Sequence, residues 1–157
     1  MPRGELPKRR KPAAGVNVPA DGQAVVLVTI CTRNRGDWLA CDKVHETLVE
    51  MWKQALAWRA GKYVIMPDHI HLFAAFTGSD ITIDAWVKYW KSIFSKRHGV
   101  PEHEWQSGSW HHRLRSGESY AEKWEYVRNN PVRHGLVKTP EEWPFQGEIF
   151  SISWEGR

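Results

Sequence analysis

Cysteine is scarce in this sequence, and long apolar runs are missing. Its two cysteines, Cys31 and Cys41, form no CxxC pair, so the sequence offers neither a cysteine-based zinc site nor a disulfide framework. We expect both thiols to be reduced, as in a cytoplasmic protein. No apolar run approaches the roughly 18 residues that span a membrane, and the charged, proline-rich start lacks the apolar core of a signal peptide. These absences predict a cytoplasmic protein without a membrane partner.

The composition is that of one basic globular domain. The chain has 157 residues, of which 41% are hydrophobic, and it contains ten tryptophans, enough for a genuine core. The net charge of +4 and the isoelectric point of about 9.2 fit a polyanionic partner, although many basic proteins bind no nucleic acid. We predict a basic flexible arm at residues 1–22 and a single domain at residues 23–157. The arm is either a solvated tail or a non-specific contact to phosphates.

Hydrophobic periodicity and turn residues predict seven secondary-structure elements. Gly61 is expected to end the first helix, and the helix before Pro131 is expected to end at Asn129-Asn130. The order β-α-β-β-α-β-α matches an α+β fold, the ferredoxin-like split βαβ sandwich. Its antiparallel sheet has helices on one face, and an additional C-terminal helix follows. The predicted strands are Ala24–Thr32, Lys62–Met66, His69–Phe76 and Trp110–Leu114, and the predicted helices are Asp42–Arg59, Ile83–His98 and Glu118–Asn130.

A histidine pair, His69 and His71, lies in the third predicted strand. Residues i and i+2 of a strand point to the same face, so the two imidazoles emerge side by side while Ile70 faces the opposite layer. Imidazole suits a divalent transition metal, and Mg²⁺ or Mn²⁺ is acceptable when oxygen ligands complete the shell. The alternative is two surface histidines on a half-exposed strand.

The last predicted helix carries Glu122, Tyr126 and Asn130 at a spacing of four residues, and hence along one helical face. A tyrosine hydroxyl can attack a phosphodiester when a metal polarises the phosphate. The amide oxygen of Asn130 or the carboxylate of Glu122 could complete the metal shell. The alternative is that Tyr126 borders the core and Asn130 ends the helix.

Cations interleave with aromatic rings in the second half of the chain. Rings stack on bases and cations pair with phosphates, so such a set suits a nucleic-acid strand. The alternative is ordinary core tryptophans among solvated lysines. The set comprises Lys88, Trp90, Lys91, Lys96, Trp105, Trp110, His111, His112, Arg113 and Arg115.

Two segments resemble a known family. Tyr63–Leu72, which contains Pro67-Asp68-His69-Ile70-His71, resembles the histidine-hydrophobic-histidine segment of the single-tyrosine transposases. Tyr126–Val137 (YVRNNPVRHGLV) resembles the signature of their REP-associated branch, Tyr-(Ile/Val)-x-x-Asn-Pro-Val-(Arg/Lys)-x-Gly. The dipeptides Trp105-Gln106 and Leu114-Arg115 also fit, and the resemblance covers roughly residues 24–146.

The resemblance implies a metal-dependent transposase and endonuclease of single-stranded DNA, in a bacterial and nucleoid-associated setting. It makes His69 and His71 metal ligands and Tyr126 the nucleophile, which forms a 5′-phosphotyrosine link and frees a 3′-hydroxyl. The position four residues after the tyrosine supplies a further polar ligand, often Gln in the family; here it is the shorter Asn130.

The family also implies Mg²⁺ or Mn²⁺ and a DNA hairpin with a short single-stranded guide. Its members are monomers or homodimers. Lys88, Lys91, Lys96, Arg113, Arg115 and Arg133 are the expected nucleic-acid contacts.

A competing tyrosine and three rival functions remain. Tyr120 lies six residues before Tyr126, about 120° away around a helix, so only one of them can face the histidines. We expect Tyr120 to pack or to hydrogen-bond near the helix start. The main rival is a domesticated protein that binds hairpin DNA without cleaving it. A replication initiator or relaxase, and an RNA-binding ferredoxin-like domain, are further alternatives.

Overall fold

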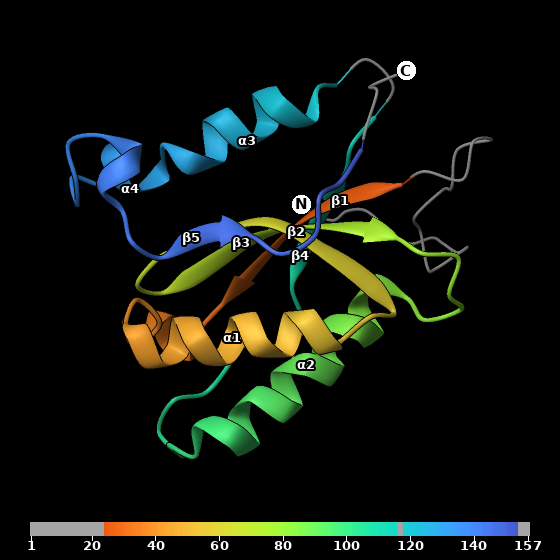
Figure 1. The fold of residues 1–157 in the computed structure, drawn as a ribbon. Helices are drawn as coiled ribbons and strands as arrows, with labels where there is room; N and C mark the ends of the chain where they lie inside the picture. Colours follow the sequence, from red (N-terminus) through yellow and green to blue (C-terminus); the bar gives the residue numbers. More distant parts are fainter. Residues whose placement is uncertain (1–23, 116–117, 154–157) are drawn as a thin grey trace.

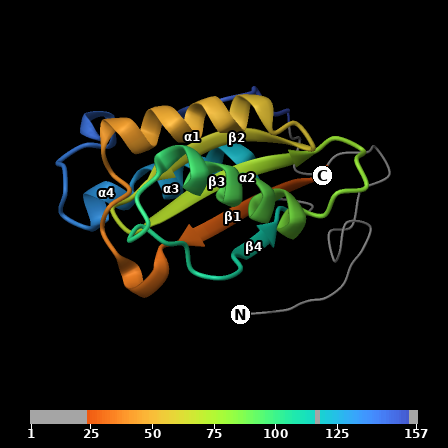
Figure 2. The ribbon, with the colours of Figure 1, turned by 90° about the horizontal axis from the view of Figure 1, so that it is seen from below.

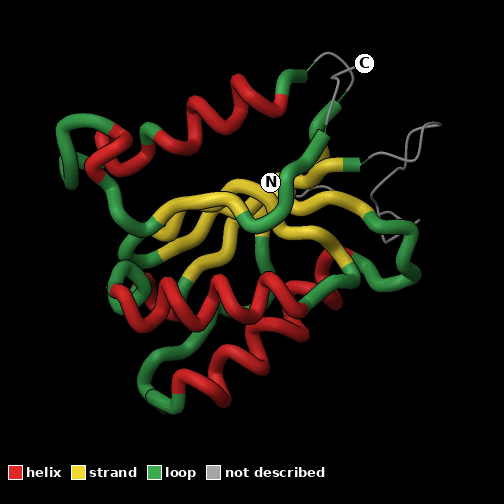
Figure 3. The backbone as a smooth tube through the Cα atoms, viewed as in Figure 1, coloured by secondary structure: helices red, strands yellow, loops and turns green. Residues whose placement is uncertain are grey.

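One antiparallel sheet organises the computed structural model, which describes residues 24–115 and 118–153. The predicted arm at residues 1–22 lies outside these residues. The five strands follow the spatial order β4-β1-β3-β2-β5, so β3 lies at the centre, between β1 and β2. Figure 3 shows these strands as one layer between helices. The strands are β1 (Val25–Cys31), β2 (Trp58–Ile65), β3 (His69–Phe76), β4 (Trp110–Arg113) and β5 (Gln146–Glu148).

Helices cover both faces of the sheet. The helices α1 (Asp42–Gln54) and α2 (Ile83–His98) lie against one face, and α3 (Tyr120–Arg128) and α4 (Asn130–Arg133) lie over the other (Figures 1 and 2). The α+β class, the antiparallel sheet and the additional C-terminal helix are confirmed. None of the helices described is long and apolar enough to cross a bilayer.

Alternation along the central strands gives each face its own core. Ile70 and Leu72 of β3 point into the large core beneath α1 and α2. Phe73 belongs to the smaller core on the other face, where it meets Tyr120 and Val127 of α3. Because successive strand residues point to opposite faces, the odd-numbered histidines of β3 share the α3 face with Phe73.

The prediction was wrong at the boundary between α1 and β2. The helix ends at Gln54, not near Arg59, and β2 already begins at Trp58. Trp58 is fully buried, and its indole N–H donates to the Ile81 carbonyl at 2.8 Å. This burial outweighs the local helical periodicity, as tertiary packing often does.

Gly61 lies inside β2 and does not end a helix. A Cβ at this position would overlap the Ile152 side chain and would lie 2.8 Å from the Tyr120 hydroxyl oxygen. The glycine is therefore needed because the C-terminal segment and α3 approach the strand closely.

The C-terminal segment docks on the sheet through Trp143-Pro144-Phe145, as expected. The Trp143 indole N–H donates to the Ile65 carbonyl at 3.0 Å, and β5 pairs with β2. Trp154 lies outside the described residues. The three-residue strand β5 carries no alternating pattern long enough to be predicted from sequence.

Candidate active site

The two histidines meet on the sheet face beneath α3 and α4. The ring centroids of His69 and His71 are 4.8 Å apart, with an interplanar angle of 83°. Their cross-strand neighbours on β1 are Cys31 and Thr29, respectively. Paired residues of adjacent strands share a face, so β1 supplies the next row of side chains beside the pair.

One nitrogen of each imidazole has a fixed partner. His69 Nδ1 lies 2.7 Å from Asp68 Oδ1, and His71 Nδ1 lies 3.1 Å from Thr29 Oγ1. An ionised carboxylate only accepts hydrogen bonds, so Nδ1 of His69 carries the proton and its Nε2 carries a lone pair. Metal-binding histidines are typically oriented through the second ring nitrogen in this way.

A guanidinium from a strained turn holds Asp68. Arg35 Nε donates to Asp68 Oδ2 at 3.0 Å. Arg35 and Asn34 both adopt a φ of 56° in the 3-10 turn η1 (Arg33–Arg35), a left-handed conformation that is costly for non-glycine residues. Thr32 ties the turn to Asp68, since its hydroxyl and its backbone N–H both donate to the Asp68 carbonyl at 3.1 Å.

Burial and charge keep the histidines neutral. Burial lowers the pKa of His71 to about 3, and the nearby His69 and Arg133 act in the same direction. Burial also lowers the pKa of His69, although the Asp68 carboxylate opposes this effect. Partial burial would raise the pKa of Asp68, but the hydrogen bonds from His69 and Arg35 lower it overall. Both imidazoles therefore keep a lone pair at neutral pH.

Asn130 is the residue that brings the C-terminal motif to the histidines. Its side chain is buried, and its Nδ2 lies 3.3 Å from His69 Nε2. Its Oδ1 accepts a hydrogen bond from Arg133 at 3.2 Å, and its backbone carbonyl lies 3.0 Å from His134 Nδ1. Asn130 opens α4, because the chain breaks from α3 at Asn129.

Tyr126 points outward from α3 and is 68% exposed. The Arg133 guanidinium carbon lies 4.0 Å from the centroid of its ring. Arg133 therefore bridges Tyr126 and Asn130. Tyr120 behaves as predicted: it is buried, and its hydroxyl accepts a hydrogen bond from the Lys62 backbone N–H at 3.1 Å.

Of the two candidate third ligands, the structure brings only Asn130 to the histidines. Glu122 is exposed on the first turn of α3, where its backbone N–H donates to the Ser119 hydroxyl. Within residues 24–115 and 118–153, no three His, Cys, Asp or Glu side chains are grouped to hold a metal ion. Asn130 is the predicted third ligand that lies beside the histidines.

The predicted cationic set is divided between the two faces. Lys88, Lys91 and Lys96 lie on α2, across the sheet from the histidines. Lys91 is buried, and its Nζ donates to the Gln106 and Gly108 carbonyls at 2.9 Å. It holds the loop before β4 in place.

Arg113 and Arg115 of the set lie at the edge strand β4, at the end of the sheet away from the histidines. Arg113 is the last residue of β4, and it pairs with Val26, whose side chain faces α2. Arg115 is exposed just beyond that strand. Among the predicted cations, Arg133 contacts both Asn130 and Tyr126.

Sequence reasoning missed the residues that support the histidines. Asp68 could have been noticed because it directly precedes His69. Thr29 and Arg35 give no such signal, since only the strand register and the turn bring them to the site.

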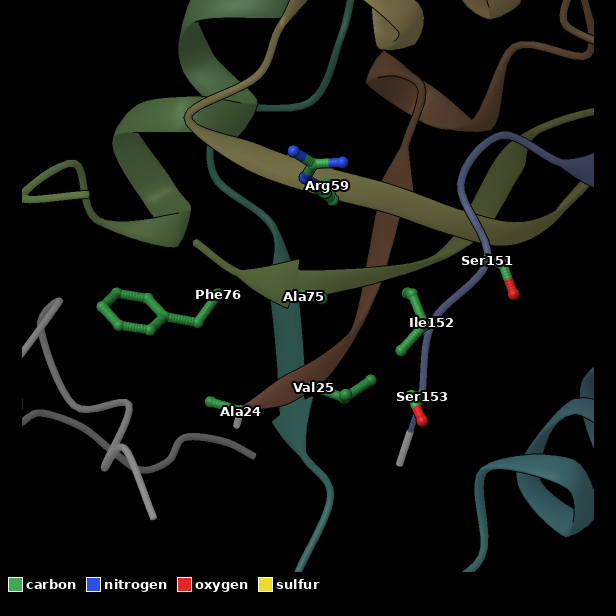
Figure 4. Close-up of a pocket in the computed structure, with 8 residues that line it drawn as sticks. All are labelled: Ala24, Val25, Arg59, Ala75, Phe76, Ser151, Ile152 and Ser153. Atoms are coloured by element: carbon green, nitrogen blue, oxygen red, sulfur yellow. The ribbon is translucent and has the colours of Figure 1, made fainter. Parts of the chain in front are cut away.

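A separate shallow pocket lies at the far ends of β1 and β3. Val25, Arg59, Phe76 and Ile152 are among its lining residues (Figure 4). Because Val25 starts β1 and Phe76 ends β3, this pocket is at the opposite end of the sheet from His69. It takes no part in the histidine site.

Comparison with known proteins finds the same fold and similar sequences among transposases. No protein-family model matches the chain. A solved structure of a REP-associated tyrosine transposase bound to a REP hairpin has the same fold, with a TM-score of 0.71 at 21% identity. That alignment covers 95% of this chain and 96% of the other.

The curated relatives carry the same family name. A REP-associated tyrosine transposase of Escherichia coli (strain K12) is 29% identical over 104 residues, which are 60% of this chain and 61% of that protein. A provisionally named REP-associated tyrosine transposase of Haemophilus influenzae (strain ATCC 51907 / DSM 11121 / KW20 / Rd) is 27% identical over 114 residues, 59% and 64% of the two chains. The chain thus spans a little over three fifths of the length of these relatives. The predicted resemblance to REP-associated tyrosine transposases is confirmed.

Proposed function

We propose that this protein is a transposase that cleaves and rejoins single-stranded DNA beside a hairpin, with Tyr126 as the nucleophile. One observation carries the proposal: Asn130, four residues after Tyr126, lies with its Nδ2 3.3 Å from His69 Nε2. The two motifs that resemble the family are 61 residues apart at this contact, and they meet at one site. A relative of the same fold binds a REP hairpin, which supports hairpin DNA as the substrate.

The side chains present fit a divalent metal. His69 and His71 each have Nδ1 engaged, by Asp68 and Thr29, which orients both rings for binding through Nε2. The amide oxygen of Asn130 would be a third ligand, once it is turned from Arg133. Mg²⁺ or Mn²⁺ bound there would polarise the scissile phosphate and offset its negative charge.

The protein side chains account for the remaining steps. Arg133 places a positive charge over the Tyr126 ring, where it can attract the phosphate to the nucleophile. The Tyr126 oxygen attacks phosphorus and the bond to the deoxyribose 3′-oxygen breaks. The phenol proton passes to solvent, to which the 68% exposed Tyr126 is open, and the 3′-oxygen takes up a proton from solvent. The energy of the broken phosphodiester bond is kept in the tyrosyl phosphate ester, so the step reverses without a nucleoside triphosphate.

One chain can assemble this site. Asn130 and His69 of the same chain are in contact, so α3 and α4 return over their own sheet (Figure 1). We therefore favour cleavage by a monomer over a homodimer that exchanges its tyrosine helices.

The decisive experiment looks for the covalent intermediate. Single-stranded oligonucleotides from the flanks of the gene, each with its hairpin, are incubated with the full chain and Mn²⁺, and the adduct is sought by mass spectrometry. Tyr126→Phe should abolish the adduct while DNA binding persists. Tyr89→Phe is the matched control, because Tyr89 is 56% exposed on α2, across the sheet. Hairpin binding without any adduct in the wild type would instead indicate a domesticated binding protein.

The histidines have their own test. His69→Ala and His71→Ala should each abolish Mn²⁺-dependent cleavage, because each removes one imidazole of the pair. Full cleavage by the wild type in EDTA would refute the metal site.

A further inference from the structure

An exposed tryptophan lies in one row with the histidine site. In the strand register, Thr29 of β1 pairs with His71 of β3 on one side and with Trp110 of β4 on the other. Paired residues of adjacent strands share a face, and the hydrogen bond between Thr29 and His71 shows which face this is. The Trp110 side chain therefore belongs to the face of the histidines.

The exposure of Trp110 sets it apart from the tryptophans of the core. Trp110 is 50% exposed, whereas the core residues Trp52, Trp58, Trp86 and Trp90 are at most 1% exposed. Tryptophan is enriched at interfaces, because it combines a large apolar ring with a polar N–H. Among the residues that the structure describes, β4 is the last strand on this side of the sheet.

The distance from the site suits a nucleotide close to the scissile phosphate. Strands are spaced about 4.8 Å apart, so Trp110 lies about 10 Å from His71 along the row. At about 3.4 Å or more per nucleotide, this span corresponds to at most about three nucleotides of single strand. The flat indole suits an unpaired base, because base–aromatic stacking is sequence-tolerant and needs no exact hydrogen-bond partner.

We propose that Trp110 is a stacking platform for an unpaired base within three nucleotides of the scissile phosphate. This inference rests on the proposed function, because it assumes that the histidine site holds a DNA phosphate. The platform is a binding site on the edge strand β4, and it holds the single-stranded DNA in line with Tyr126. His112 shares this face two residues further on and pairs with Glu118, which ties β4 to the segment that leads into α3.

The test combines a protein substitution with abasic nucleotides in the substrate. The full chain is titrated with hairpin oligonucleotides that carry one abasic site at each of the three positions on either side of the cleavage point. One of these abasic sites should weaken binding to the wild type about 5- to 150-fold, the range for one stacked base. Trp110→Ala should bind intact DNA more weakly by the same factor, and that abasic site should not weaken its binding further. Trp110→Phe should keep part of the affinity.

The control and the opposing outcomes separate this inference from the proposed function. Tyr89→Ala removes an exposed ring from α2 on the opposite side of the sheet and should change neither binding nor abasic sensitivity. If the wild type forms the tyrosyl adduct but Trp110→Ala binds as tightly as wild type, or still responds to every abasic site, the platform is refuted and the transposase remains. If the wild type neither binds nor cleaves DNA, both proposals fail.

Discussion

Asp68→Asn should weaken metal binding without removing a metal ligand. The Asp68 carboxylate accepts from His69 Nδ1 at 2.7 Å and from Arg35 Nε at 3.0 Å. Both of its oxygens are thus used by donors. An amide has one oxygen and one NH₂ group, so asparagine must turn a donor toward either the imidazole or the guanidinium. His69 then loses its fixed proton position, or Arg35 loses its acceptor.

Loss of such an orienting partner typically costs 10- to 100-fold in metal affinity, or about 1.4–2.7 kcal/mol. We expect this loss for Mn²⁺ binding to Asp68→Asn, measured from the free-ion signal in electron paramagnetic resonance. Arg35→Ala should reduce affinity in the same direction and by less, since Asp68 can still hold the imidazole. The double variant should lose less than the sum, because both residues act on His69 in one chain of contacts.

A neighbouring ion pair supplies the matched control. Arg33 lies in the same turn as Arg35, and its guanidinium is 2.9 Å from the Glu104 carboxylate. Both side chains are largely exposed. Glu104→Gln should leave Mn²⁺ affinity unchanged. Wild-type affinity in Asp68→Asn, or an equal loss in Glu104→Gln, would show that Asp68 does not position His69.

Three further changes test the site and the fold. Acid should destabilise the protein: the folded-state pKa of His71 is about 3, below its ordinary 6.5, so the unfolded chain binds a proton that the folded chain does not. Stability therefore falls as the pH drops from 6.5 toward 3, and thermal melts should show a smaller fall in His71→Asn. Gly61→Ala should cost about 1–3 kcal/mol in urea unfolding, since the new methyl would meet Ile152 and Tyr120; an unchanged midpoint would contradict the close packing. Asn130→Ala should slow cleavage about tenfold or more and Asn130→Gln should restore part of the rate, whereas equal rates in both variants would exclude a role for the amide.

Residue patterns alone determined the central strands and the direction of the histidines. β1 is apolar and rich in β-branched residues, and β3 is mostly apolar; the two-residue repeat of a strand assigns His69 and His71 to one face and Ile70 to the other. The predicted helix end near Asn129-Asn130 was correct to within two residues, since α3 ends at Arg128, but Asn130 before the proline is helical again as the first residue of α4. The motif that contains Tyr126 also needed no structure to be noticed.

Local patterns failed where long-range packing decided the outcome. The periodicity that extends α1 to Arg59 is overruled by the burial of Trp58 in β2. Lys91 was predicted to contact nucleic acid, yet its side chain is buried and bonded to two loop carbonyls. Nothing in a helix period reveals which face of a sheet the helix covers, so the lysines of α2 could not be separated from the site in advance.

The sequence by itself thus determined the order of the first four strands along the chain, the shared face of His69 and His71, and the residues that resemble the transposases. Only the tertiary structure decided that Asn130 reaches His69, that Arg35 holds Asp68 and that Trp110 shares the row of His71. The physical reason is the range of the interactions. Side-chain direction in a strand follows from neighbouring residues, whereas each of these contacts depends on a strand register or a docked helix that the whole core must fix.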